Sequence, residues 1–76
     1  MKREDIIDLH SHHRIDAARV IPAPSQSRKW ILFFLETEGR SYFLLNENDD
    51  ICQFQTVDEA IGELQALGFK WAVVRF

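Results

Sequence analysis

Lys29 to Leu45 reads KWILFFLETEGRSYFLL, and this stretch decides the fold because it holds two runs in which every residue is apolar, Trp30 to Leu35 and Tyr42 to Leu45. A strand points successive side chains to opposite faces, so both faces of the resulting hairpin must be hidden from water. We expect one face to pack on the protein's own helix. The other would be covered by the N-terminal segment, a second subunit or a partner.

The turn of this hairpin is predicted at Glu38-Gly39, because glycine readily adopts the positive φ that two-residue turns need. This register sets Leu35 opposite Tyr42, and apolar side chains then meet at every central pair. One face combines apolar side chains with a polar rim, as a binding surface does. We predict that a partner binds the residues on this face, which are Leu35, Thr37, Arg40, Tyr42 and Leu44.

The sequence after the hairpin contains one strong helix. Thr56-Val57-Asp58-Glu59 is a capping box, which predicts a helix that begins at Val57. Gly68 predicts its end, because glycine takes the left-handed conformation there. The segments 51–54 and 69–76 on either side are predicted strands. The helix has an apolar stripe at helical spacing, formed by Val57, Ala60, Ile61, Leu64 and Leu67.

These elements predict a small α+β domain in the order strand, strand, strand, helix, strand. A mostly antiparallel four-stranded sheet would have one helix packed on one face. The last strand would run parallel to the first and third, and the sequence leaves open which of them it joins. Residues 28–76 form the predicted domain. Residues 1–27 are predicted to be a loosely structured N-terminal arm and linker, with a short helix or strand at most, because Pro22 and Pro24 lie among small polar residues.

Length and composition limit the class of protein. A chain of 76 residues makes one domain, and such a domain buries only about 60 % of its unfolded surface, so a homodimer would help to stabilise it. A single cysteine excludes an internal disulfide and fits a reducing compartment. No apolar run reaches the roughly 20 residues of a membrane span. We therefore expect a cytoplasmic protein that does not contact membranes.

Charge divides the chain into a basic and an acidic part. Residues 1–29 carry six Lys and Arg against four Asp and Glu, whereas residues 30–76 carry three against eight. The basic part can fold onto the acidic domain, dock on a neighbouring copy or bind an external anion. Nucleic acid is a possible but not favoured partner, because the overall balance is acidic. Its binding would use Arg14, Arg19, Arg28, Lys29 and Arg40, with Trp30 and Tyr42 as stacking faces.

The histidines offer a possible metal site. Asp8-Leu9-His10-Ser11-His12 resembles the Asp-x-His-x-His signature of amidohydrolase-type hydrolases, in which two imidazoles bind a divalent metal and later strands of a barrel supply further ligands. This chain is too short for that barrel, and no histidine follows His13. Metal binding by the histidine cluster is therefore an alternative, and a solvated polar arm is the favoured interpretation.

No other residues form a catalytic group. Cys52 lies on a short predicted strand without a histidine or a glycine-rich turn nearby to lower its pKa, which favours a buried structural thiol. The glycines are scattered and cannot cradle a phosphate. The sequence therefore predicts no catalytic residues, no cofactor and no resident metal.

A family resemblance covers about residues 30–76. The patterns Gly39-x-x-Tyr42-x-Leu44, Phe54-x-Thr56-Val57-Asp58-x-Ala60 and Leu64-x-x-Leu67-Gly68-Phe69 resemble those of short uncharacterised bacterial proteins, some labelled as plasmid replication or partition related. The resemblance implies a shared fold, because these are turn, cap and core positions. It implies no catalytic residues.

The sequence thus predicts a non-catalytic interaction module that associates with itself or with a partner through a sheet face or edge. The first alternative is an accessory nucleic-acid-associated protein of the plasmid replication or partition type, using the basic N-terminal arm. The second is metal binding by the histidine cluster.

Overall fold

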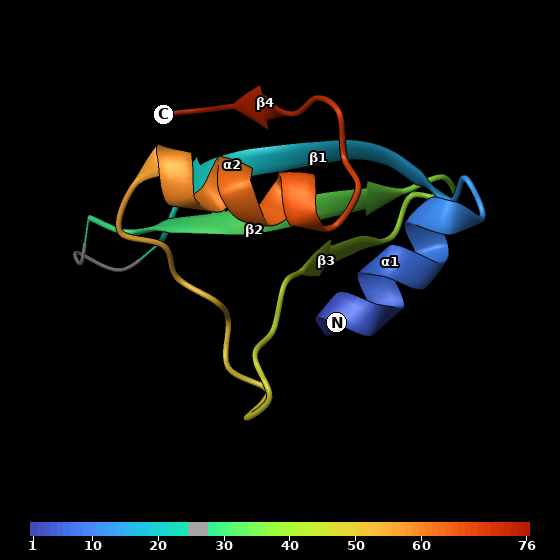
Figure 1. The fold of residues 1–76 in the computed structure, drawn as a ribbon, viewed down its shortest axis with the longest axis horizontal. Helices are drawn as coiled ribbons and strands as arrows, with labels where there is room; N and C mark the ends of the chain where they lie inside the picture. The colour runs from blue at the N-terminus through green and yellow to red at the C-terminus, as the bar shows by residue number, and fades with distance from the viewer. Residues whose placement is uncertain (25–27) are drawn as a thin grey trace.

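The computed structural model describes residues 1–24 and 28–76. Figure 1 shows its elements in chain order, which are α1 (Arg3–Ser11), β1 (Ile15–Pro22), β2 (Trp30–Glu36), β3 (Ser41–Phe43), α2 (Val57–Ala66) and β4 (Val73–Val74). The strands form one sheet in the order β3-β2-β1-β4, in which β1 is antiparallel to β2 and parallel to β4, and β2 is antiparallel to β3.

The predicted α+β class is confirmed, with two corrections. The sheet is mixed rather than mostly antiparallel, and the domain has two helices rather than one. Both corrections come from the N-terminal segment, which is not a loose arm: it forms α1 and the central strand β1. The domain boundary predicted near residue 28 lies between β1 and β2, which pair from Ile15↔Glu36 to Pro22↔Trp30.

The hairpin register predicted from the sequence is wrong by one residue. Phe34 lies opposite Tyr42 rather than Phe43, and Phe33 lies opposite Phe43. The amide of Glu36 donates to the Arg40 carbonyl at 2.7 Å, so the loop has three residues, not two. Gly39 ends this loop with a φ of +91°, as a three-residue hairpin requires. A shift of one residue moves every β3 side chain to the other face.

Helix α2 follows the prediction closely. The Thr56 hydroxyl accepts from the Glu59 amide at 3.1 Å, and the Glu59 carboxylate accepts from the amide of Gln55 rather than Thr56. At the other end, Gly68 has a φ of +99° and the Phe69 amide donates to the Leu64 carbonyl at 3.0 Å. This pattern is a Schellman motif.

The flanking strands differ more from the prediction. Residues 51–54 contribute only two isolated bridges, Leu45↔Ile51 and Trp30↔Phe54, and the sheet instead gains β1 on the other side of β2. The last strand is limited to Val73–Val74 and pairs with β1, which is neither of the two neighbours that the sequence allowed, the strand at 30–35 and the strand at 51–54. Because only two residues of β4 pair with β1, the segment between α2 and β4 diverges from β1.

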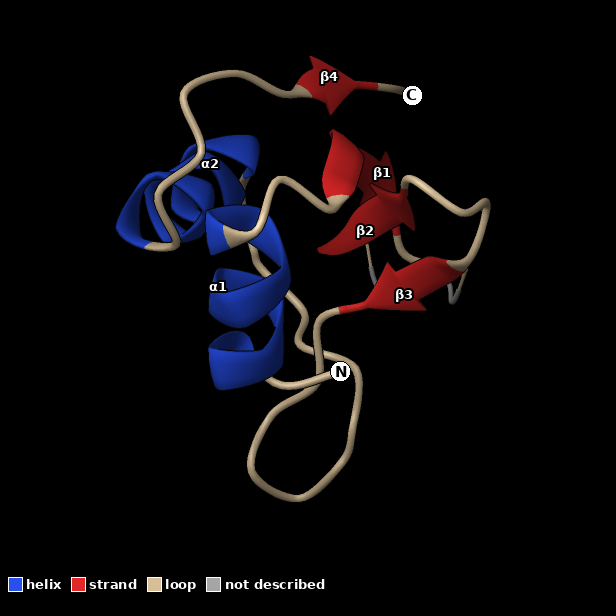
Figure 2. Ribbon diagram, turned by 90° about the vertical axis from the view of Figure 1, so that its right-hand side faces the viewer, coloured by secondary structure: helices blue, strands red, loops and turns tan. Residues whose placement is uncertain are grey.

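Both helices lie on the same side of the sheet (Figure 2). The side chains that fill the space between the helices and the sheet are fully or almost fully buried. Among the described residues, no helix is long and apolar enough to cross a membrane. The core consists of Ile6, Ala18, Val20, Leu32, Phe34, Leu44, Ala60, Leu64, Leu67 and Phe69.

Candidate interaction surface

The candidate site is the sheet face opposite the helices, which we call the open face. Strand alternation assigns its residues, because Leu32 and Phe34 point into the core and their neighbours must point away. Residues paired directly across strands share a face, which extends the assignment to β1, β3 and β4. Among the described residues, no helix covers this face (Figure 2). The open face comprises Ala17, Arg19, Ile21, Ile31, Phe33, Leu35, Ser41, Phe43 and Val73.

The open face is mostly apolar and partly accessible, with Ile31 buried at 1 % exposure. Phe43 is 37 % exposed and Val73 is 40 % exposed, while Phe33 and Leu35 are half-buried. The rings of Phe33 and Phe43 meet edge to face with their centroids 5.5 Å apart. Large apolar side chains that adjoin one another on a surface mark interaction sites more often than scattered ones do.

Arg19 is the one charged residue that strand pairing assigns to the open face among the described residues. It lies on the central strand β1, opposite Phe33 on one side and Val73 on the other. Its Nε is buried, and within the described part of the chain it has no hydrogen-bond partner. A buried donor without a partner costs about 1–3 kcal/mol. Arg19 is therefore a cation held in an apolar surround near the centre of the open face.

The structure separates the five residues that the sequence predicted to bind a partner. Of these, Leu35 alone belongs to the open face. Leu44 is a fully buried core residue, and Tyr42 points to the helix side because it lies opposite Phe34. Thr37 is the first residue of the hairpin loop, and Arg40 follows the loop. The one-residue register error causes the difference, since it exchanged the two faces of β3.

Sequence reasoning missed Phe43, Val73 and Arg19 as members of one surface. The hairpin pattern placed Phe43 on the helix side, and the arm containing Arg19 was not expected in the sheet. The length of the loop was the missing information: with three residues between Glu36 and Arg40, strand alternation alone would have assigned Phe43 correctly.

Tyr42 and Arg40 belong to a polar cluster around Glu36 at the hairpin end. Glu36 is 5 % exposed, and its carboxylate accepts from the Tyr42 hydroxyl at 3.1 Å and from Arg14 Nη2 at 3.4 Å. Arg14 Nη2 also lies 3.0 Å from Glu38 Oε1. A hydrogen bond with Tyr42, followed by the charges of Tyr42, Glu36 and Glu38, raises the pKa of Arg40 above its ordinary value. The cluster joins the N-terminal segment to the hairpin.

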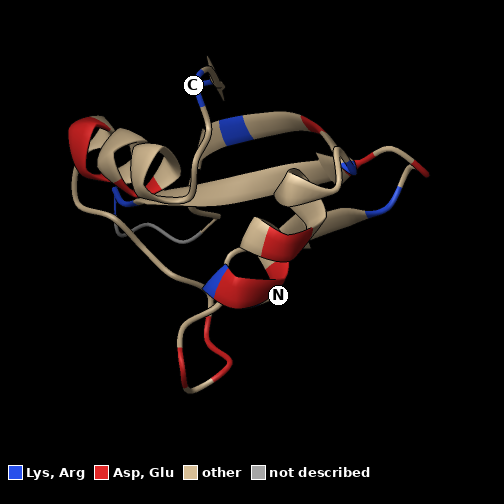
Figure 3. Ribbon diagram, turned by 45° about the vertical axis from the view of Figure 1, so that its right-hand side comes forward, with Lys and Arg blue, Asp and Glu red and all other residues tan. Residues whose placement is uncertain are grey.

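The basic N-terminal residues also pair with acids elsewhere in the chain. Arg3 Nε lies 3.0 Å from Glu63 Oε2 on α2, and Lys2 Nζ lies 3.7 Å from Asp49 Oδ1. Figure 3 shows acidic residues in the loop after β3 and on α2. Of the three destinations that the sequence left open for the basic part, folding onto the acidic part is the one observed for Lys2, Arg3 and Arg14.

The histidines make contacts within the fold. The His10 ring stacks on Phe69 with centroids 4.0 Å apart, and its Nε2 lies 3.2 Å from the Gly68 carbonyl. His12 Nδ1 lies 2.8 Å from the Asp8 carbonyl at the end of α1. In the described ranges, no group of three or more His, Cys, Asp or Glu is placed to hold a metal ion. These positions favour a structural role for His10.

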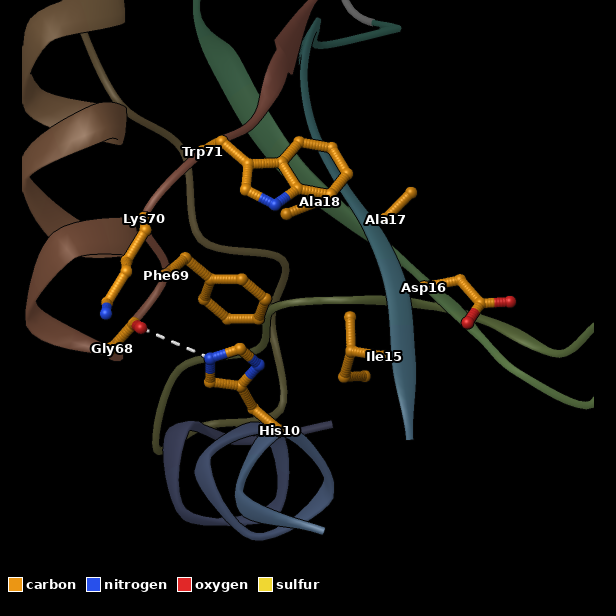
Figure 4. Close-up of a pocket in the computed structure, with 9 residues that line it drawn as sticks. All are labelled: His10, Ile15, Asp16, Ala17, Ala18, Gly68, Phe69, Lys70 and Trp71. Atoms are coloured by element: carbon orange, nitrogen blue, oxygen red, sulfur yellow. Dashed lines mark hydrogen bonds between the residues drawn. The ribbon is translucent and has the colours of Figure 1, made fainter. Parts of the chain in front are cut away.

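A small pocket lies where the chain diverges from β1 before β4 begins (Figure 4). Its volume is about 280 Å³, just under the 300–1,000 Å³ typical of small-molecule sites. His10 and Phe69 form one wall, and Trp71, which is 65 % exposed, stands at the rim. Asp16 and Lys70 are its charged lining residues, and they come from different segments.

Comparison with known proteins adds no assignment, because no protein-family model, curated protein or solved structure matches this chain. The resemblance to plasmid-related bacterial proteins therefore stays a prediction. The open face is the feature from which a function can be inferred.

Proposed function

We propose that this protein is a non-catalytic interaction module that binds another polypeptide through its open face. The observation that carries the proposal is the composition of this face: adjoining apolar side chains on three strands, with Arg19 among them. A small domain gains nothing in solubility from exposing such a surface, and binding removes the apolar area from water.

The position of Arg19 within the open face also supports this role. Arg19 presents a cation in an apolar surround, and its buried Nε has no hydrogen-bond partner among the described residues. An arginine within an apolar patch is typical of the residues that dominate interface energetics. A partner that supplies an acceptor over Arg19 would gain both the apolar contact and the hydrogen bond.

The competing alternatives have less support. The nucleic-acid alternative uses Arg14, Arg19, Arg28, Lys29 and Arg40; of these, Arg14 lies beside carboxylates of the same chain and Arg19 lies in the apolar open face. The metal alternative requires His10, whose ring packs on Phe69 and whose Nε2 faces the Gly68 carbonyl.

Site-specific photo-cross-linking in the expressing cell tests the proposal. A photoreactive phenylalanine analogue replaces Phe43 on the open face, and in a matched control it replaces the exposed Gln65 on α2. We expect a discrete adduct from position 43 and not from position 65, and we expect Leu35→Lys to abolish it. Equal labelling from both positions, or no adduct from position 43, would refute the proposal.

A further inference from the structure

The strand β1 carries opposite charges three residues apart. Arg19 lies on the open face, and Asp16 lies at a bulge where the register between β1 and β2 shifts. Figure 4 shows the Asp16 carboxylate on the side of β1 away from Ile15, which packs against the core. A bulge re-aims a side chain in this way. Asp16 is exposed, and within the described chain its carboxylate forms no ion pair.

A surface with this pattern is complementary to itself when it is turned by a half rotation. In a two-fold dimer, residue i of one copy contacts residue j of the other, and j contacts i. An axis that lies between two facing sheets and crosses β1 at right angles reverses the strand direction. If it passes between Ala17 and Ala18, it places Asp16 of each copy against Arg19 of the other.

We infer that the occupant of the open face is a second copy of this chain, packed sheet to sheet about such a two-fold axis. The inference rests on the proposed function and names its partner. Facing sheets pack about 10 Å apart, a gap that the side chains of Arg19 and Asp16 span together. The resulting ion pairs give the Arg19 guanidinium a carboxylate partner, which the described part of the chain does not supply.

The neighbouring side chains fit the same arrangement. Ala17 is the small open-face residue beside the axis, where facing backbones come closest. Leu35 lies opposite Ala17, and Phe33 lies opposite Arg19. The half rotation therefore places Leu35 of one copy beside Phe33 of the other. Apolar contacts then flank the two ion pairs on the β2 side.

Charge reversal separates this dimer from other associations. In the Asp16→Arg dimer, positions 16 and 19 are both arginine, so each arginine faces an arginine of the other copy. In the Arg19→Asp dimer, both positions are aspartate, so each aspartate faces an aspartate. Each variant should raise the dimer dissociation constant at least about tenfold, because like charges at an interface cost several kcal/mol. An equimolar mixture of the two variants should restore the dimer, and so should the double variant.

Sedimentation equilibrium from micromolar to sub-millimolar concentration measures these constants. Control variants with the same charge changes at exposed positions, Glu47→Arg and Arg28→Asp, should retain the wild-type constant. Rescue in the mixture also demonstrates that both variants fold, since an unfolded chain could not restore the dimer. A wild-type chain that stays monomeric, or a dimer that is indifferent to both reversals, would overturn the inference.

The cross-linking experiment at position 43 distinguishes this failure from failure of the proposed function. An adduct of the chain with itself supports both. A discrete adduct with a different polypeptide, together with a monomer in sedimentation, would overturn the second-copy inference and leave the interaction function standing. Absence of any adduct specific to position 43 would overturn both.

Discussion

The Tyr42 hydroxyl donates a hydrogen bond of 3.1 Å to the Glu36 carboxylate across the β2–β3 hairpin. Glu36 is the one charged residue found in the buried set of the described chain, with 5 % exposure. Arg14 supplies the second donor from the segment between α1 and β1. The pair therefore fixes the observed register, because only the three-residue loop places Tyr42 on the same side as Glu36.

Tyr42→Phe should lower the free energy of unfolding by about 2 kcal/mol, because it removes a donor from a buried carboxylate. Urea denaturation followed by circular dichroism measures the change. Ser41→Ala, at the exposed neighbouring position, is the control and should alter stability by less than about 0.5 kcal/mol. A Tyr42→Phe protein as stable as the control would show that the hydroxyl does not satisfy Glu36.

Two glycine substitutions should have opposite signs. Gly39 has a φ of +91° and no atom lies within 4 Å of the point that a Cβ would occupy, so Gly39→Ala meets no clash but should cost about 1 kcal/mol in backbone strain. Gly62 lies within α2, also in open space, and Gly62→Ala should stabilise the protein by up to about 1 kcal/mol. Denaturation midpoints that move in the same direction would contradict the assigned backbone conformations.

The contact between His10 and Phe69 should stabilise the docking of α1. His10→Ala removes both the ring stack and the interaction with the Gly68 carbonyl, whereas His10→Phe keeps the stack. We expect His10→Ala to cost more than His10→Phe, and the stack itself to contribute about 1 kcal/mol. Thermal melts of the two variants, with and without added zinc, compare them. A zinc-dependent rise in the wild-type melting temperature that both variants lose would instead support the metal alternative.

Cys52 should react slowly in the native protein. Burial, followed by the charge of Glu63, raises the pKa of the Cys52 thiol. A raised folded-state pKa favours the neutral thiol, so this contribution to stability is fully present below the unfolded pKa, about 8.5 for cysteine, and is lost as pH rises through the folded pKa. Alkylation by iodoacetamide at pH 8.5 should be slower than in urea, and Cys52→Ala should weaken the fall in stability above that pH. Equal alkylation rates would refute the shift.

The elements that the sequence predicted well are those whose determinants are local. The Thr56 cap, the apolar stripe of α2 and the Gly68 terminus all depend on residues within one helix. The strand character of Trp30–Glu36 was equally clear, because its apolar run is long. Such features need no information about distant parts of the chain.

The features that the sequence did not reveal depend on contacts between distant segments. Segment 15–22 has a weak strand pattern of its own, and its position in the centre of the sheet comes from pairing with β2 and β4. Which side of the sheet the helices cover also depends on distant segments. The apolar runs indicated two faces in need of cover, but they could not indicate that α1 packs on the same side as α2 (Figure 2).

A pair of lysine substitutions tests the observed register against the one predicted from the sequence. The predicted register puts Leu35 and Leu44 on one accessible face, whereas the structure puts Leu35 on the open face and buries Leu44 completely in the core. Leu44→Lys should therefore cost about 4 kcal/mol or more and unfold the protein, because it buries a charge without a partner.

Leu35→Lys should leave a folded chain and weaken self-association, because Leu35 is half-buried on the open face and outside the core. Circular dichroism reports the folding of both variants, and sedimentation reports their association. Two folded variants that both dissociate would favour the register predicted from the sequence. An unfolded Leu44→Lys beside a folded, monomeric Leu35→Lys would match the structure, since only a side chain outside the core can accept the charge and keep it in water.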